Sequence, residues 1–211
     1  KQSSNSIGMI KVEKVKNALD YHKADLNGFR DYADMFSFSM DNLSSFVVNT
    51  QRLQAYALKY AIEVCRSAWP NVSGVMPWQL SDPWPNVSWS VIDYFYRPKL
   101  SYKMLKTAYS PILPMVRKWR KSKTPDNQQG DWRQADIIIH NSTQDDFKGF
   151  LEYEVKRGEK VLQSQRLGIR APNDCAIRIG TVNVKVNPGV VVRLKIFDPE
   201  SNLIAKNFNF P

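Results

Sequence analysis

The hydrophobic pattern changes character near Pro125, and this change restricts the folds open to the chain. Beyond it, short runs rich in β-branched residues alternate with polar ones, and turn signals such as Asn187-Pro188-Gly189 separate them. Six or seven short strands over roughly 85 residues predict an antiparallel β-sandwich of immunoglobulin type. The Cys-Trp-Cys signature of antibody domains is missing, so the prediction concerns the architecture only. The expected strands are residues 135–140, 150–155, 161–167, 175–186, 190–197 and 203–210.

The first half of the chain has helical spacing instead. Apolar residues recur at three- and four-residue steps over residues 42–68, with Asp41 or Ser39 as the expected N-cap. A short apolar run at residues 74–80 predicts a buried strand, and the prolines after it end any regular element. Helix, strand, loop and helix in this order are typical of a parallel α/β unit. The other expected helices are residues 10–19, 25–38 and 99–109.

The net charge of +10 raises the question of nucleic-acid binding. Part of it comes from residues 117–126, which hold five basic side chains and one acidic side chain. We interpret this stretch as a solvated connector, because no nucleic-acid-binding motif accompanies it, and we expect no nucleic-acid partner. The predicted organisation is a first domain over residues 1–116, a basic linker over 117–130, and the sandwich over 131–211.

Tryptophans concentrate in residues 74–94, where Trp78, Trp84 and Trp89 surround Asp82. Indoles in an irregular, proline-rich loop are costly to expose unless they pack or stack on something. They could simply close the end of a core. They could also stack on the apolar face of a sugar ring, with a carboxylate nearby for its hydroxyl groups.

The same stretch resembles the end of the catalytic barrel in glycoside hydrolase family 2, and its β-mannosidase branch in particular. This stretch departs from the family pattern at Ser81, where asparagine is usual, and has Pro83 at a variable position. The resemblance therefore specifies the family better than it specifies the branch and the sugar that the enzyme would cleave. The matching segments are WQLSD at 78–82, WP at 84–85, SWS at 88–90, IDY at 92–94 and PK at 98–99.

The resemblance implies the fold and the site. The first domain would be a mostly helical α/β remnant of a (β/α)8 TIM barrel, followed directly by the immunoglobulin-like sandwich. Trp78 would be the platform under the sugar, Asp82 would accept hydrogen bonds from hydroxyls or position its loop neighbours, and Trp84 would shape the pocket wall. Structural roles are expected for Glu63, Arg66, Trp89, Asp93 and Tyr94.

Retaining glycoside hydrolysis requires two carboxylates about 5 Å apart. In the family both are glutamates on earlier barrel strands, whereas Glu13 and Glu63 are the two glutamates before residue 121 here. Neither lies in an Asn-Glu pair, and we interpret Glu63 and Arg66 as a structural ion pair or as packing residues, because a glutamate followed by an arginine three residues later on a helix is most often a surface pair. We therefore expect both catalytic glutamates to be absent, and the chain to be an inactive C-terminal piece of an enzyme acting on β-linked sugars.

A second hypothesis is a non-catalytic carbohydrate-binding or structural module with an immunoglobulin-like fold. No metal or cofactor is expected, because His22, His140, Cys65 and Cys175 show no ligand spacing. No apolar run reaches the length of a membrane span, so no membrane partner is expected. The compartment stays open, with a lean to a secreted or periplasmic parent. A barrel remnant would expose apolar surface, so self-association is also expected.

Overall fold

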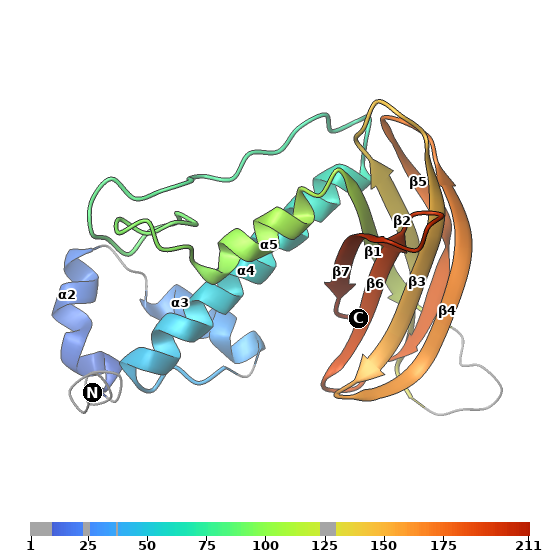
Figure 1. The fold of residues 1–211 in the computed structure, drawn as a ribbon. Helices are drawn as coiled ribbons and strands as arrows, with labels where there is room; N and C mark the ends of the chain where they lie inside the picture. The colour runs from blue at the N-terminus through green and yellow to red at the C-terminus, as the bar shows by residue number, and fades with distance from the viewer. Residues whose placement is uncertain (1–9, 23–25, 37, 123–129) are drawn as a thin grey trace. The chain divides into compact units, whose positions relative to one another are not determined.

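The computed structural model describes residues 10–22, 26–36, 38–122 and 130–211 (Figure 1). The chain divides into two compact units. The helical unit comprises residues 1–61 and 76–106, and the sandwich unit comprises residues 62–75 and 107–211. Among the described residues, no helix has the length and apolar character needed to cross a membrane.

The helical unit is built around the first part of a long helix, α4. Its small core contains Leu19, Ala33, Met40 and Phe46, all buried. Phe29 packs edge-on against Phe46 with 5.8 Å between ring centroids. Aromatic and aliphatic side chains from three helices thus share one apolar cluster. The helices are η1 (Val12–Val15), α2 (Lys16–Tyr21), α3 (Leu26–Met35), α4 (Leu43–Ser67) and α5 (Leu100–Ala108).

The start of α4 is set by a reciprocal cap. The Ser45 backbone N–H donates to Asn42 Oδ1 at 2.9 Å, and the Asn42 N–H donates to Ser45 Oγ at 3.3 Å. Such a cap satisfies donors that the first helical turn leaves unpaired. The helix matches the predicted residues 42–68 closely, but Asn42 takes the N-cap position expected for Asp41 or Ser39. These two residues instead bond to each other, through Ser39 Oγ and Asp41 Oδ2 at 2.7 Å.

The sandwich unit contains two antiparallel sheets. One has the strand order β1-β2-β5 and the other β4-β3-β6-β7 (Figure 1). The predicted β-sandwich is therefore present, with an additional strand, β1, at its start. The strands are β1 (Ile112–Lys121), β2 (Trp132–Asn141), β3 (Phe147–Arg157), β4 (Lys160–Ala171), β5 (Cys175–Lys185), β6 (Val190–Phe197) and β7 (Leu203–Asn209).

Alternating side chains of the two sheets form one core. On β6, Val192, Leu194 and Ile196 are fully buried, while the residues between them are not. Ile137 and Ile139 of β2 belong to the same buried cluster, so it is contributed by both sheets. This period of two is the property of a strand with one face on a core and one face on solvent.

Two predicted assignments differ from the structure. Residues 117–121, expected in a linker, are the end of β1, where Arg120 pairs with Gln134 and Lys121 with Arg133 of β2. Residues 123–129 of the same predicted linker lie outside the described residues. The predicted strand at 74–80 is wrong, because this stretch has no strand structure and is largely exposed. An apolar run becomes a strand only where another strand pairs with it.

Candidate functional site

The tryptophan loop, residues 76–99, belongs to the helical unit and is held by short backbone pairings. The Ile92 N–H donates to the Leu80 carbonyl at 2.9 Å, and the Lys99 N–H donates to the Val91 carbonyl at 2.9 Å. Isolated bridges link Ile92 to Ser81 and to Pro98. The segment therefore folds back on itself twice without forming a sheet, as expected where prolines remove backbone donors.

A buried carboxylate lies at the centre of this loop. The Asp82 side chain accepts hydrogen bonds from Ser88 Oγ and from Ser90 Oγ, the latter at 2.7 Å. Lys99 Nζ lies 3.4 Å from Asp82 Oδ2 and donates to Ser90 Oγ at 2.8 Å. With its charge compensated and only 7% of Asp82 exposed, this residue positions the loop rather than offering an acceptor at the surface.

The three indoles of the loop are exposed. Trp78 is 77% exposed, Trp84 59% and Trp89 69%. The peptide bond between Trp78 and Gln79 is cis. The interpretation that these rings close a core does not agree with their exposure in this structure. Exposed indoles of this kind are suited to stacking on a flat apolar ligand face.

Helices α4 and α5 fasten the loop through one glutamine. Gln54 Nε2 donates to the carbonyl oxygens of Trp89 and Ser90 at 2.7 and 3.1 Å. Ser101 Oγ donates to Gln54 Oε1 at 2.9 Å. The Trp89 backbone is thus fixed while its ring remains exposed. Sequence reasoning missed Gln54, because a polar residue on a helix carries no signal of its distant partners.

A second carboxylate organises the turn that follows Ile92. Asp93 Oδ1 accepts the backbone N–H groups of Phe95 and Arg97 at 2.8 and 2.9 Å, and Arg97 Nε donates to Oδ2 at 2.7 Å. Removal from water would raise the pKa of Asp93, but the hydrogen bonds from Arg97 hold it below its usual value. The turn presents Tyr94 43% exposed and Tyr96 86% exposed.

Glu63 belongs to the sandwich unit and is fully buried there. Its Oε1 accepts from Asn207 Nδ2 at 2.6 Å, and its Oε2 accepts from Asn209 Nδ2 at 2.7 Å. Both asparagines lie on β7, so the carboxylate joins the last turns of α4 to an edge strand of the sheet. Both Glu63 and Arg66 are buried, so they do not form a pair at the surface of the helix.

Arg66 connects several segments of the sandwich unit. Its Nε donates to His140 Nδ1 at 2.7 Å, and its Nη1 donates to the carbonyl oxygens of Ala108 and Ser110 at 2.7 and 2.8 Å. Burial lowers the pKa of Arg66 to about 10. Burial, together with the nearby guanidinium of Arg66, lowers the pKa of His140 to about 4. The imidazole is thus neutral at pH 7 and accepts at Nδ1.

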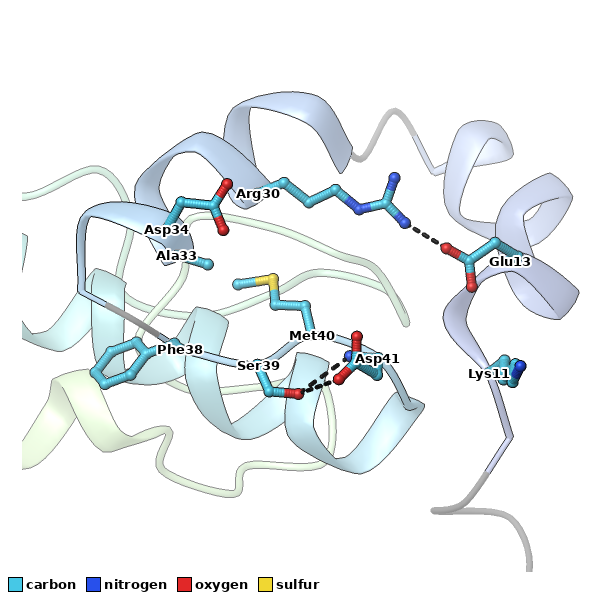
Figure 2. A pocket seen from close by; sticks show the side chains of 9 residues that line it. All are labelled: Lys11, Glu13, Arg30, Ala33, Asp34, Phe38, Ser39, Met40 and Asp41. Carbon is cyan, nitrogen blue, oxygen red and sulfur yellow. Dashed lines mark hydrogen bonds and ion pairs between the residues drawn. The ribbon is translucent and has the colours of Figure 1, made fainter.

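Other parts of the described chain offer less chemistry. No group of three metal-ligating side chains occurs in the described ranges. A cavity of about 460 Å³ lies in the helical unit, where the Glu13–Arg30 ion pair closes one side (Figure 2). Figure 2 also shows the hydrogen bond between Ser39 and Asp41, two of its lining residues. None of the residues predicted to bind substrate lines this cavity.

The comparisons with known proteins agree with this architecture. No family model matches the chain. Beta-mannosidase B of Thermothelomyces thermophilus is 35% identical over 80 residues, 36% of this chain and 9% of the relative. Beta-mannosidase B of Aspergillus clavatus is 25% identical over 182 residues, 81% of this chain and 21% of the relative. The crystal structure of a beta-D-mannosidase from Dictyoglomus thermophilum superposes with a TM-score of 0.71 at 24% identity.

The matched region is a minor part of each of these proteins. The alignment covers 91% of this chain but 23% of the Dictyoglomus thermophilum chain. The chain therefore spans about a tenth to a quarter of the length of the proteins it matches. The sequence similarity and the shared fold together make this chain similar to a C-terminal part of β-mannosidase-like enzymes of glycoside hydrolase family 2.

Proposed function

We propose that this chain is the substrate-facing C-terminal part of a retaining glycoside hydrolase that acts on β-linked sugars, with β-mannosides as the favoured class. The observation that carries the proposal is the tryptophan loop, in which Trp78 is 77% exposed above a scaffold fixed by Asp82. An indole held on a rigid loop can stack on a sugar ring without losing much conformational freedom on binding.

In this proposal the helical unit is the last part of a (β/α)8 barrel, and the sandwich unit is an immunoglobulin-like domain that follows it. Active sites of such barrels lie at the C-terminal ends of the strands, where βα loops meet. The tryptophan loop would belong to that face. Trp78 would be the sugar platform, Trp84 a wall of the pocket, and Trp89 a further exposed ring beside them.

The catalytic carboxylates would come from a part of the protein outside these residues. Glu63 is a poor candidate, because its two carboxylate oxygens already accept hydrogen bonds from Asn207 and Asn209 in a fully buried position. Glu13 is exposed and paired with Arg30. Both glutamates are thus engaged in structural contacts, whereas a retaining site needs a pair of carboxylates that face the substrate about 5 Å apart. The chain by itself would therefore bind sugar weakly and not hydrolyse it.

A carbohydrate-binding module without catalysis is the second candidate, and the exposure of all three loop indoles favours it. The two candidates differ in the expected affinity. A complete module would bind a β-mannooligosaccharide with saturation, whereas an incomplete pocket would give weak, non-saturating contact.

The test is saturation-transfer NMR with methyl β-mannoside and with β-1,4-mannobiose on the chain. Transfer lost in Trp78→Ala and retained in Tyr32→Ala would support sugar contact at the loop. Tyr32 is a matched control, because its ring is 61% exposed in the same unit. Equal transfer to the wild type and to Trp78→Ala would refute the platform role. Saturable binding at micromolar concentrations would favour the module.

A further inference from the structure

The four-stranded sheet of the sandwich unit has a solvent-facing side on which basic side chains are concentrated. Its inner face is fixed by buried side chains such as Leu151, Ile169 and Leu194. Because successive strand residues point to opposite sides, the residues between them face outward. The outward-facing basic residues of β3, β4, β6 and β7 are Lys148, Lys156, Arg166, Arg170, Arg193, Lys195 and Lys206, and together they define the basic sheet face.

Charge is unevenly divided between this face and its surroundings. The seven basic residues share the outward side of the sheet with two acidic ones, Glu152 and Glu154. Two of the seven also pair with acidic residues just outside the strands, Arg170 with Asp146 at 2.8 Å and Lys156 with Glu159 at 3.7 Å, so the face together with these partners has a net charge of +3. The remaining positions of residues 131–211 hold five basic and six acidic side chains, a net charge of −1, so the excess positive charge of the sandwich lies on this face, where it attracts anionic ligands.

The basic side chains lie in register across the strands. Glu152 faces Arg166 on one neighbouring strand and Lys195 on the other, and Lys195 faces Lys206. Lys195 Nζ lies 3.3 Å from Glu152 Oε1, so one base in this row is compensated. Strand spacing places such neighbours about 5 Å apart, so the row offers closely spaced cations to an extended ligand.

Three bases of the face, Lys148, Arg193 and Lys206, are exposed and have no hydrogen bond or ion pair within the described residues. Lys148 lies opposite Arg170, which pairs with Asp146, whereas Arg193 and Lys206 lie on the neighbouring strands β6 and β7. Cationic groups without internal partners lose little on binding an external anion. They are therefore the positions where an anionic ligand gains most.

Aromatic rings lie among these cations. The Arg166 guanidinium carbon lies 4.6 Å from the centroid of the Phe150 ring and 5.5 Å from that of Phe197. These contacts hold the guanidinium in place on the sheet. On β7, Phe208 is the cross-strand partner of Arg193 and packs edge-on against Phe210, which is 44% exposed.

We propose that the basic sheet face binds a carboxylated polysaccharide, a glycan bearing uronate groups. This rests on the proposed glycosidase function, which supplies glycans as the encountered ligands. Uronate carboxylates pair with Arg193 and Lys206, and sugar rings pack on the adjacent phenylalanines. The face would hold the enzyme on an anionic matrix at a place distinct from the tryptophan loop. An extended, regularly charged chain suits a flat row of cations better than a compact ligand does.

The experiment measures binding of the 211-residue chain to polygalacturonate by calorimetry over a series of salt concentrations. The test variant is Arg193→Glu/Lys206→Glu. The matched control is Lys14→Glu/Lys16→Glu, which makes the same change in net charge at exposed positions of the helical unit. The proposal expects at least a tenfold loss of affinity in the test variant and less than a threefold loss in the control. It also expects a shallower salt dependence in the test variant.

Neutral mannan, polyglutamate and duplex DNA serve as comparison ligands. No binding to polygalacturonate at low salt would overturn the proposal, and so would equal loss of affinity in the test and control variants. Binding to polyglutamate or DNA as tight as to polygalacturonate would indicate a general polyanion surface or another class of partner, and would also overturn it. Retention of polygalacturonate binding in Trp78→Ala separates this site from the loop, so either proposal can fail alone.

Discussion

Replacing Glu63 tests whether this carboxylate holds the fold together. In Glu63→Ala, the Asn209 amide loses its acceptor at 2.7 Å, and Asn207 keeps the Pro114 carbonyl at 2.8 Å but loses the carboxylate at 2.6 Å. An unsatisfied buried donor costs about 1–3 kcal/mol, and a hydrogen bond to a charged group contributes about 1.5–3 kcal/mol. We expect the free energy of unfolding of the sandwich to fall by about 3–5 kcal/mol.

The assay is urea unfolding followed by β-sheet circular dichroism and tryptophan fluorescence. Glu63→Gln is the informative companion, because it keeps the shape but places an amide against two asparagine amides. It should lower the midpoint of unfolding while Glu13→Ala, at an exposed ion pair, leaves it unchanged. Urea midpoints of Glu63→Gln and Glu63→Ala equal to that of the wild type would refute the structural role of Glu63. Such a result is the one expected of a catalytic glutamate, which can be replaced without loss of stability.

Three further predictions concern stability and the loop. The pKa of His140 is about 4 in the folded chain and about 6.5 in the unfolded chain, so protonation of its imidazole favours the unfolded state. The free energy of unfolding should therefore fall by about 3 kcal/mol as the pH drops from 6.5 to 4. In His140→Gln, the urea midpoint should depend less on pH between pH 6.5 and 4 than it does in the wild type. An unchanged pH dependence would contradict the buried contact between His140 and Arg66. Asn141→Ala should cost about 2–4 kcal/mol, because it leaves the Asp145 and Ala171 carbonyls without their amide donor, and thermal unfolding measures this loss. Asp82→Ala should raise the rate of proteolysis within the loop at least fivefold, whereas unchanged cleavage would mean that the loop does not depend on this carboxylate.

Much of the secondary structure follows from local pattern. Strand β6 spans Val190–Phe197, as its alternation predicts, and α4 begins within a residue of the predicted start. Strand β1 was missed because its last residues are basic, and its first six are buried on both faces, so it shows no alternation. The apolar stretch at 74–80 was wrongly assigned as a strand. It has the composition of a strand, but pairing depends on neighbours that composition does not reveal.

The candidate site was predictable in part. The tryptophans and Asp82 could be named from their concentration in one stretch and from its resemblance to the family, and they lie in one loop of the helical unit. Whether a ring is exposed and where Asp82 directs its oxygens depend on contacts between distant residues, such as Lys99 and Gln54. The burial of Glu63 was equally invisible, because its asparagine partners lie 144 and 146 residues further along the chain.

The central claim is that this chain carries a sugar platform but not the catalytic carboxylates. The most direct measurement is hydrolysis of a chromogenic β-mannoside by the purified chain at high protein concentration, with its mass verified as 24.3 kDa. We predict no release of the chromophore above the uncatalysed rate, for the wild type and for Glu63→Gln alike. Turnover by the wild type that disappears in Glu63→Gln would contradict it, because the catalytic carboxylate would then lie within these 211 residues.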